Sequence, residues 1–325
     1  MIPVARTAPA EEFLSGGVLP FERMMKRIFV TGGTGFVGKS VIRALLAHSF
    51  LVRCLVRPGS EAHLRGFEAI DRVPGDVLEP DALAGSVEGC AAIVHLVGII
   101  REHRLQGATF ERLHTQATAN MLAVAKQAGV TRFLHMSALG TRADARSRYH
   151  RTKWQAEEAV RASGLDWTIF RPSVIYGPGD EFVSLFAAMI RRLPAVPVLG
   201  DGRYRLQPVA VEHVAEGFAR ALSLHETIGQ TYEVAGPVAL PFDELLDQIG
   251  RALRKPKVRK VHSPMGLVKL STRLLHWLPG YPVTMDQLQM LEEESVTDPS
   301  RFYADMGLRP EPLPDGLNRM LAPPR

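Results

Sequence analysis

Apolar and polar residues recur along the chain with two distinct periods. Short runs rich in β-branched and aromatic residues predict β-strands, and apolar residues three or four positions apart predict α-helices. The predicted strands are 27–30, 51–57, a short strand followed by a turn within 71–77, 91–98, 131–137 and 167–171. The helices between them include 37–46, 113–127 and 149–160. Because strands alternate with helices and such crossovers are right-handed, the pattern predicts an α/β fold built on a doubly wound parallel sheet.

This alternation fades after Pro172 into loops rich in Gly and Pro. Helical spacing there predicts further helices at 182–192, 212–224, 242–253 and 263–278. We therefore expect a nucleotide-binding domain over 25–178, to which 205–236 returns, and a smaller, mainly helical substrate or partner domain over 179–325. Residues 1–24 lack the basic-then-apolar order of a signal peptide. We expect them to form a disordered tail, or to precede a true start at Met24 or Met25.

The segment Thr31-Gly-Gly-Thr-Gly-Phe-Val-Gly-Lys-Ser40 lies between the first predicted strand and helix. Counted from Gly32, it has the G-x-x-G-x-x-G spacing of a dinucleotide-binding turn in a Rossmann fold. Counted from Gly33, it has the P-loop spacing G-x-x-x-x-G-K-S. Either turn would offer unpaired N–H groups of a helix N-terminus to a phosphate.

The P-loop interpretation requires an Asp after a nearby apolar strand, where it helps to hold Mg²⁺. The most apolar strand ends His95-Leu-Val-Gly98, and no such Asp follows it. The sequence therefore favours dinucleotide binding, and a P-loop nucleotide-binding protein is the remote alternative.

The end of the second predicted strand indicates which dinucleotide binds. An Asp or Glu there accepts hydrogen bonds from a ribose 2′-hydroxyl, whereas an Arg can pair with a 2′-phosphate. The strand ends in Arg57, which favours NADP(H) over NAD(H). NAD(H) stays open, because the alternative is that Arg57 is a solvated arginine at a strand end. Asp76 and Val77 follow the third strand, where an adenine edge would be bound; a plain turn is the alternative.

Tyr149-His-Arg-Thr-Lys153 places a phenol and an ammonium one helical turn apart, on one helix face. A nearby cation would lower the pKa of Tyr149 toward neutral pH. Tyr149 could then exchange a proton with a carbonyl or alcohol while a hydride moves to or from a nicotinamide. Ser137 ends the fifth strand, at the edge where open α/β sheets bind ligands, and its hydroxyl would orient the same substrate oxygen. The alternative for the Tyr149/Lys153 pair is an ordinary surface contact.

Together these motifs resemble the short-chain dehydrogenase/reductase superfamily, from about Lys26 to the C-terminus. The glycine segment, Ser137, Tyr149-x-x-x-Lys153 and Arg171-Pro-Ser-Val-Ile-Tyr-Gly-Pro178 are similar to its extended, epimerase/dehydratase-like branch. Three further segments resemble most the atypical subgroup that contains the NADPH-binding accessory subunit of mitochondrial complex I and its bacterial relatives. They are Val94-His-Leu-Val-Gly-Ile-Ile100, Met136-Ser-Ala-Leu-Gly140 and Gln207-Pro-Val-Ala-Val-Glu-His-Val214.

The resemblance implies a set of cofactor-binding residues. These are Gly32, Thr34, Gly35, Phe36, Val37, Gly38, Arg57, Asp76, Val77, Leu96, Gly98, Lys153 and Pro172. It also implies that Lys153 bonds the nicotinamide ribose and that backbone after Pro172 faces the nicotinamide. Ser137, Tyr149 and Lys153 are implied as the catalytic residues, and no metal site is expected.

Two features depart from the extended branch. Its members usually carry Asn in an N-x-x-G-T-x-N pattern before the fifth strand, where this chain has His114-Thr-Gln-Ala-Thr-Ala-Asn120. Only 11 residues separate Ser137 from Tyr149, fewer than in typical epimerases. The loop that shapes a sugar-nucleotide pocket is therefore trimmed, and nothing in the sequence identifies a nucleotide-sugar substrate.

The net charge of +5 is distributed unevenly over the 325 residues. No acidic residue occurs from Gln248 to Met285, a stretch with eight Lys and Arg, so the remainder carries −3. Its predicted helix 263–278 is basic and amphipathic and contains Trp277, which is typical of contact with a membrane surface. The alternative is that its apolar side packs on the core. The arginines lack interleaved aromatic residues, so no nucleic-acid partner is expected.

Two observations indicate where the protein is located. The longest apolar run, 91–100, is about half the roughly 20 residues that span a bilayer, so no transmembrane helix is predicted. The only cysteines, Cys54 and Cys90, suit a reducing compartment. We expect a cytoplasmic protein, with peripheral attachment to the inner face of the membrane left open.

Two functions remain. One is an oxidoreductase or epimerase that acts on a small-molecule carbonyl, alcohol or quinone. The other is a non-catalytic NADPH-binding accessory or assembly module of a membrane-associated quinone or NADH redox system.

Overall fold

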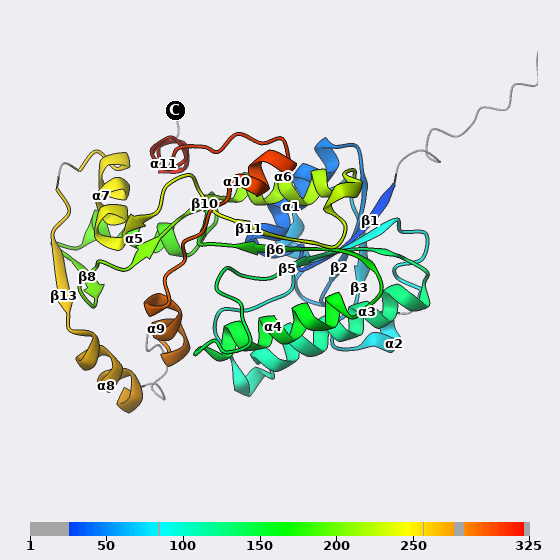
Figure 1. Cartoon of the computed structure of the whole chain (residues 1–325), viewed down its shortest axis with the longest axis horizontal. Coiled ribbons are helices and arrows are strands. Elements are labelled where there is room, and N and C mark those ends of the chain that lie inside the picture. The colour runs from blue at the N-terminus through cyan, green and yellow to red at the C-terminus, as the bar shows by residue number, and fades with distance from the viewer. Residues whose placement is uncertain (1–25, 84, 256, 276–282, 322–325) are drawn as a thin grey trace, which may run out of the picture.

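The computed structural model describes residues 26–83, 85–255, 257–275 and 283–321. Within them, a sheet of seven parallel strands forms the centre of the molecule, in the order β11-β6-β5-β4-β1-β2-β3 (Figure 1). Its strands are β1 (Arg27–Thr31), β2 (Leu51–Val56), β3 (Asp71–Pro74), β4 (Ala92–His95), β5 (Arg132–Met136), β6 (Asp166–Pro172) and β11 (Gln230–Val234). The predicted α/β fold with a doubly wound parallel sheet is therefore confirmed.

Helices cover both faces of this sheet (Figure 1). On one face lie α1 (Phe36–Ala47) and α6 (Val211–Ala221). On the other lie α2 (Pro80–Leu83), α3 (Ala117–Gln127) and α4 (Arg148–Arg161), with a π-helical turn, η4 (Glu111–Gln116), leading into α3. Because both faces are buried, the central strands are nearly continuous runs of apolar residues, as the sequence pattern indicated.

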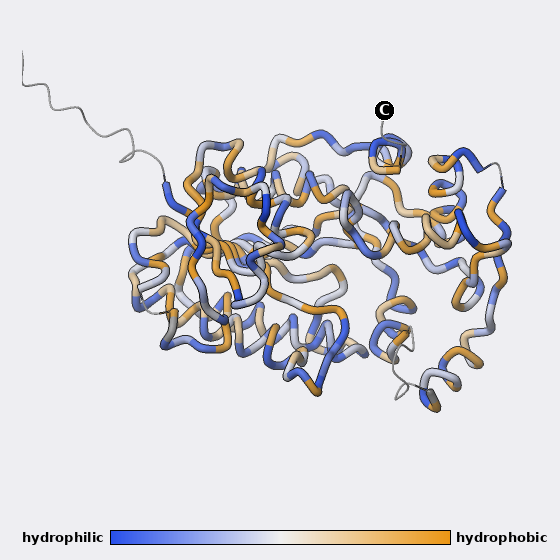
Figure 2. Tube along the Cα trace, turned by 180° about the vertical axis from the view of Figure 1, so that it is seen from behind, coloured by the Kyte–Doolittle hydropathy of each residue, from blue (hydrophilic) through white to orange (hydrophobic). Residues whose placement is uncertain are grey.

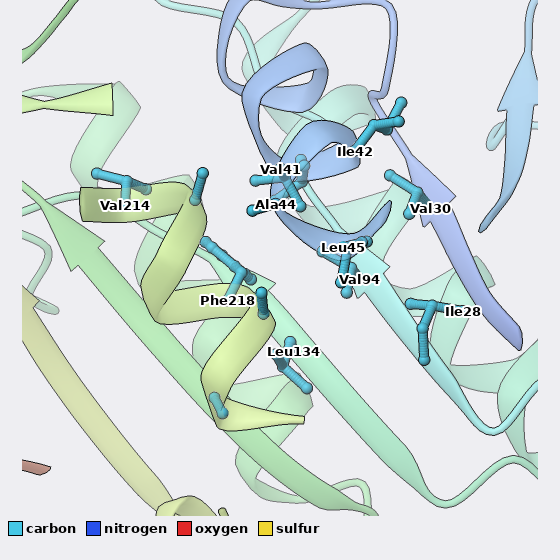
Figure 3. Packing of buried hydrophobic residues seen from close by; sticks show 14 of the residues in the cluster. Ile28, Val30, Val41, Ile42, Ala44, Leu45, Val94, Leu134, Val214 and Phe218 are labelled. Carbon is cyan, nitrogen blue, oxygen red and sulfur yellow. The ribbon is translucent and has the colours of Figure 1, made fainter. Parts of the chain in front are cut away.

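Alternate residues of each central strand face the two helical layers. Strand residues facing α1 and α6 form one core cluster, which includes Ile28, Val30, Val94 and Leu134 (Figure 3). They pack against helix residues such as Val41 and Leu45 of α1 and Phe218 of α6. The intervening residues, among them Phe29, Ile93, Phe133 and Ile169, form a second cluster with α3 and α4. This double-sided core holds the carboxyl ends of β1, β4, β5 and β6 at a common edge.

A second lobe, with its own apolar core, extends from that edge (Figure 1). Its helices are α5 (Phe182–Arg192), α7 (Phe242–Ala252), α8 (Met265–Leu275), α9 (Met285–Glu292) and α11 (Leu313–Leu321), while α10 (Ser300–Asp305) packs beside β11. Short strand pairs link them: β8 (Val196–Leu199) with β13 (Lys260–Ser263), β7 (Ile175–Tyr176) with β10 (Val209–Ala210), and β9 (Arg205–Leu206) with β12 (Leu240–Pro241).

Residues 205–236 supply β11 and α6 to the Rossmann half. The division into domains at 178/179 stays a prediction, and the predicted tail 1–24 lies outside the described residues.

Helix α8 does not pack its whole apolar side on the core, which was one of the two placements predicted for it. Leu267, Leu270 and Leu274 are 63%, 54% and 62% exposed, whereas Val268 and Thr272 point inward and are buried. The expectation that the apolar side packs on the core is therefore wrong for these three leucines. The predicted helix extended to 278, but residues 276–278 lie outside the described part of the chain.

Candidate active site

The glycine turn connects β1 to α1 at the point where the strand order reverses, between β1 and β4. Gly32 has φ +74°, a conformation that favours glycine, and a Cβ there would lie 2.9 Å from the backbone of Leu96 at the end of β4. A Cβ on Gly38 would lie 2.2 Å from the carbonyl oxygen of Gly32. Both positions therefore need glycine, one for the turn and one for packing of α1 against it.

The N-terminus of α1 provides free donors at this turn. Gly35 is its N-cap and is exposed, and no side chain caps the helix. Among the described residues, the backbone N–H groups of Phe36, Val37 and Gly38 have no protein acceptor. Thr34 lies in the same turn and is partly exposed. This geometry fits a pyrophosphate, because unpaired amides and the positive end of the helix dipole would face it.

Arg57 lies directly after β2, with an exposed side chain beyond the glycine turn. Asp76 accepts a hydrogen bond from the Leu78 amide at 2.9 Å, so part of its carboxylate closes a local turn. Val77 is buried, and its carbonyl accepts a hydrogen bond from Asn120 Nδ2 at 2.8 Å. Asn120 occupies the last position of the N-x-x-G-T-x-N pattern of the extended branch, and here its hydrogen bond to Val77 anchors the loop after β3.

Ser137 and Lys153 meet at the carboxyl end of β5. The Ser137 hydroxyl is buried and donates to Thr141 Oγ1 at 3.3 Å. Lys153 Nζ donates to the Met136 carbonyl at 2.9 Å and lies 2.9 Å from where a Cβ on Gly98 would be. The ammonium therefore lies between β5 and the segment after β4. Burial lowers the pKa of Lys153 to about 8, and the charge of Glu157 opposes this shift.

Pro172 ends β6 beside this group, and its carbonyl accepts a hydrogen bond from the Leu139 amide at 2.9 Å. Gly32, Leu96, Gly98, Ser137, Lys153 and Pro172 thus lie along neighbouring strand ends of one sheet edge. This is the edge at which open α/β sheets bind ligands.

Tyr149 lies one turn before Lys153 on α4 and is 8% exposed. Its ring makes edge-to-face contacts with Phe110 and His114, and it forms a cluster with Ala138 against which Met290 of α9 packs. Burial raises the pKa of Tyr149 to about 12. The prediction that Lys153 lowers this pKa is therefore wrong, since burial dominates.

His114, at the position where the extended branch carries Asn, links three segments. Its Nδ1 lies 2.9 Å from Thr152 Oγ1 of α4, and its Nε2 lies 3.0 Å from the Ile99 carbonyl. Its own carbonyl accepts a hydrogen bond from Thr118 Oγ1 at 2.6 Å. Burial, followed by the charge of Lys153, holds the pKa of His114 well below its ordinary value. A neutral imidazole therefore braces the helix that carries Tyr149.

Two more histidines lie under the site, on adjacent strands. His95 of β4 and His135 of β5 pair in register, and their rings stack with centroids 5.6 Å apart. His95 Nδ1 lies 2.7 Å from Thr31 Oγ1. His95 Nε2 and both ring nitrogens of His135 have no hydrogen-bond partner in the described chain. Burial and the nearby Lys153 lower the pKa of both, that of His95 to about 3.

Helix α9 also reaches this site, which the sequence analysis did not predict. Asp286 Oδ1 accepts a hydrogen bond from the Arg148 amide at 2.7 Å, and Glu293 Oε1 accepts one from the Arg146 amide at 3.0 Å. Glu293 also pairs with the Arg142 guanidinium at 3.0 Å. Acidic groups beside the N-terminus of α4 complement its dipole. In the sequence, the one signal for this contact is that Asp286 and Glu293 follow directly after a long stretch without acidic residues.

The fold and this sheet edge define an NAD(P)-binding protein of the Rossmann class. Comparison with known sequences goes further, because residues 28–235 match the NAD dependent epimerase/dehydratase family. The chain belongs to this family. The family assignment confirms the predicted resemblance, including its extended branch, and decides between the two phosphate motifs in favour of the dinucleotide.

Individual relatives carry different names. A ceramide reductase of Caulobacter vibrioides is 34% identical over 201 residues, which cover 62% of this chain and 61% of that protein. The mitochondrial NADH dehydrogenase (ubiquinone) 1 alpha subcomplex subunit 9 of Arabidopsis thaliana is 26% identical over 301 residues, covering 87% and 74%. The chain thus spans less than two thirds of the first relative and about three quarters of the second.

Solved structures share the fold over most of their length. The dTDP-glucose 4,6-dehydratase DesIV of Streptomyces venezuelae, determined with NAD and TYD bound, has a TM-score of 0.70 and 25% sequence identity. The alignment covers 91% of this chain and 95% of that one. Among the described residues, no helix is both long enough and apolar enough to cross a membrane.

Proposed function

We propose that this protein is an NADP(H)-dependent oxidoreductase that reduces a carbonyl compound, with Tyr149 as the proton donor. The observation that supports it is the arrangement at the sheet edge. Tyr149 and Lys153 are both buried on one face of α4, and Lys153 Nζ lies between the Met136 carbonyl and Gly98. A surface pair would leave both side chains in solvent.

The proposed chemistry assigns one role to each residue. Bound NADPH supplies a hydride to the carbonyl carbon. Tyr149, which is protonated at neutral pH because burial raises its pKa, donates its hydroxyl proton to the carbonyl oxygen. Ser137 donates a second hydrogen bond to that oxygen. The Lys153 ammonium would hold the nicotinamide ribose, and solvent then returns the proton to Tyr149. A protonated phenol suits reduction better than oxidation.

Cofactor selection is proposed to depend on Arg57. Its guanidinium is exposed at the end of β2, where it can pair with a 2′-phosphate in two parallel hydrogen bonds. The Arg57→Asp variant is expected to bind NADPH roughly a hundredfold more weakly and to gain affinity for NADH, because an Asp accepts from a 2′-hydroxyl and repels a phosphate. Fluorescence titration of both cofactors measures this. Arg192→Asp, with the same charge change at an exposed position of α5, is the control. An unchanged preference for NADPH would remove Arg57 from the site.

We propose a substrate of low water solubility, either a lipid ketone or a quinone. The name of the Caulobacter relative supports this, since ceramide is a membrane lipid. The smaller domain, 179–325, is proposed to bind this substrate, and the protein is proposed to act as a peripheral protein on the inner face of the cytoplasmic membrane. The exposed leucines of α8 support that location.

A second candidate is a non-catalytic NADPH-binding subunit of a quinone-linked complex. Two observations favour it: the likeness to a mitochondrial NADH dehydrogenase subunit over 87% of this chain, and His114 in place of the usual Asn.

The two functions differ in cofactor turnover. The purified chain is mixed with NADPH and, separately, with soluble aldehydes and ketones, a long-chain ketone in micelles, and a short-chain ubiquinone analogue. Loss of NADPH absorbance with any of them is the expected result. Tight binding of NADPH without oxidation by any acceptor would contradict the enzyme and favour the accessory module.

A further inference from the structure

We infer that α8 and the adjoining β13 form a docking surface for an anionic lipid bilayer. This inference rests on the proposed membrane location and specifies the residues and the lipid. The apolar part of the surface consists of Leu267, Leu270, Leu274 and Val261, which are 54–63% exposed. We call these four residues the apolar stripe.

Helix α8 presents this stripe to solvent because other residues, Val268 and Thr272, form its buried side. The three leucines follow one another at helical spacing on one face, while the buried Val268 and Thr272 lie on the opposite face. Lys269 is held at the side by Glu292 of α9 at 2.7 Å. In Figure 1, α8 lies at the outer end of the second lobe, and in Figure 2 its trace carries hydrophobic segments at that outer end. An exposed apolar helix face of this kind marks an interaction surface.

Strand β13 extends the stripe. Lys260 pairs with Asp247 at 2.7 Å and His262 with Asp243 at 3.0 Å, so both side chains point toward α7. Because side chains alternate along a strand, Val261 between them points to the other side, where it is 58% exposed.

Charge decides which occupant fits. The segment of chain that carries the stripe, Gln248 to Met285, contains eight basic residues and no acidic one. Three of them, Arg251, Lys260 and Lys269, pair with acids from outside the segment. Arg259, directly before β13, and Arg254 and Lys257, between α7 and β13, are exposed and form no ion pair within the described residues. Basic side chains around an apolar helix face are attracted to anionic headgroups while the leucines enter the acyl boundary. A second copy fits poorly, because a two-fold interface would place this basic surface against itself.

Docking at this surface would hold the catalytic edge next to the lipid. Helix α9 contacts α8 through the Lys269–Glu292 pair, and its Met290 packs against the cluster that contains Tyr149. Figure 1 shows α9 between α8 and the start of α4. A lipid-dissolved carbonyl compound would therefore reach Tyr149 from the side of the molecule that faces the bilayer.

Co-sedimentation with vesicles tests the inference. The full chain is expected to pellet with vesicles containing phosphatidylglycerol and only weakly with pure phosphatidylcholine, and added salt should reduce the difference. In the double variant Leu267→Glu/Leu270→Glu, partition should fall about a hundredfold, roughly tenfold for each leucine. The matched control is Leu105→Glu/Leu185→Glu, which changes two leucines that are 105% and 50% exposed away from the stripe. It should pellet like the wild type.

The outcomes separate lipid from protein partners and docking from catalysis. If the wild type does not pellet with anionic vesicles, or if both double variants lose binding equally, the docking surface is refuted. If Leu267→Glu/Leu270→Glu instead turns a dimer into a monomer in sedimentation velocity, the occupant is a second copy. NADPH oxidation with a soluble ketone should be the same in the wild type and this variant. If the wild type does not bind vesicles but oxidises NADPH, the proposed reaction is unaffected. If it binds vesicles but does not oxidise NADPH with any acceptor, the reaction is refuted and the docking surface is not.

Discussion

Replacing Tyr149 with Phe is expected to lower kcat for carbonyl reduction by about a thousandfold, with little effect on NADPH binding. The substitution removes only the hydroxyl that donates the proton, and general acid catalysis contributes roughly 10²–10⁴-fold. The ring would remain in its apolar contacts with Phe110, Ala138 and Met290, so the fold and the cofactor turn should be unaffected. Steady-state kinetics with the best acceptor and fluorescence titration of NADPH measure the two quantities.

A matched control distinguishes the loss of a catalytic hydroxyl from the loss of any buried phenol. Tyr204 stacks on Phe242 in the second lobe, and burial raises the pKa of its phenol as it does that of Tyr149. Tyr204→Phe should keep kcat within about twofold, because it leaves the sheet edge unchanged. Equal activity of Tyr149→Phe and the wild type would show that Tyr149 is not the proton donor. A variant that no longer binds NADPH would indicate a structural role for the hydroxyl.

The Rossmann half could be predicted because local signals and the tertiary fold agree there. The glycine turn needs glycine for its own conformation, and the central strands are apolar because both of their faces are buried. Strand β11 was not predicted as a strand. It lies at the sheet edge and, within the described residues, pairs with β6 alone. The partly exposed Thr231 and Glu233 alternate with the buried Tyr232 and Val234 over too few residues to show a period.

The candidate site depends on contacts that no sequence period encodes. The spacing of Tyr149 and Lys153 predicted a shared helix face, but the pKa of Tyr149 depends on what buries it. Phe110, His114 and Met290 come from distant segments of the chain. Likewise, the period of α8 predicted an apolar stripe without indicating whether the core or the solvent would face it. The three leucines are exposed because Val268 and Thr272 fill the inner side.

Acidification below pH 6.5 is expected to destabilise the protein steeply, because several buried histidines are held neutral. Burial lowers the pKa of His95, His114, His135 and His150 from the ordinary value of 6.5. Below 6.5 the unfolded chain therefore binds protons that the folded chain does not. Stability must then rise with pH across this window and fall on acidification, by about 1.4 kcal/mol per pH unit for each such proton.

For His95 the window extends far below pH 6.5, since its pKa falls to about 3 in the folded protein. At pH 4.5 this residue alone would cost roughly 2 kcal/mol relative to pH 6.5, a large share of the 5–15 kcal/mol typical of a folded domain. Carboxylates such as Glu102, whose pKa lies below 4.5, add to the loss only at lower pH. Urea unfolding at a series of pH values between 6.5 and 4.5 measures the slope.

One substitution isolates the contribution of the buried pair. His135→Leu removes a titrating ring and two nitrogens that have no partner in the described chain, so it should reduce the acid slope by one proton and should not destabilise the protein at pH 7. Phe133→Leu, two positions earlier in the same strand and beside His95, removes core volume without a titrating group. It should lower stability equally at every pH. If His135→Leu leaves the slope unchanged, His135 does not gain a proton on unfolding in this pH range. The conclusion that His135 is buried as a neutral ring beneath Lys153 would then be wrong.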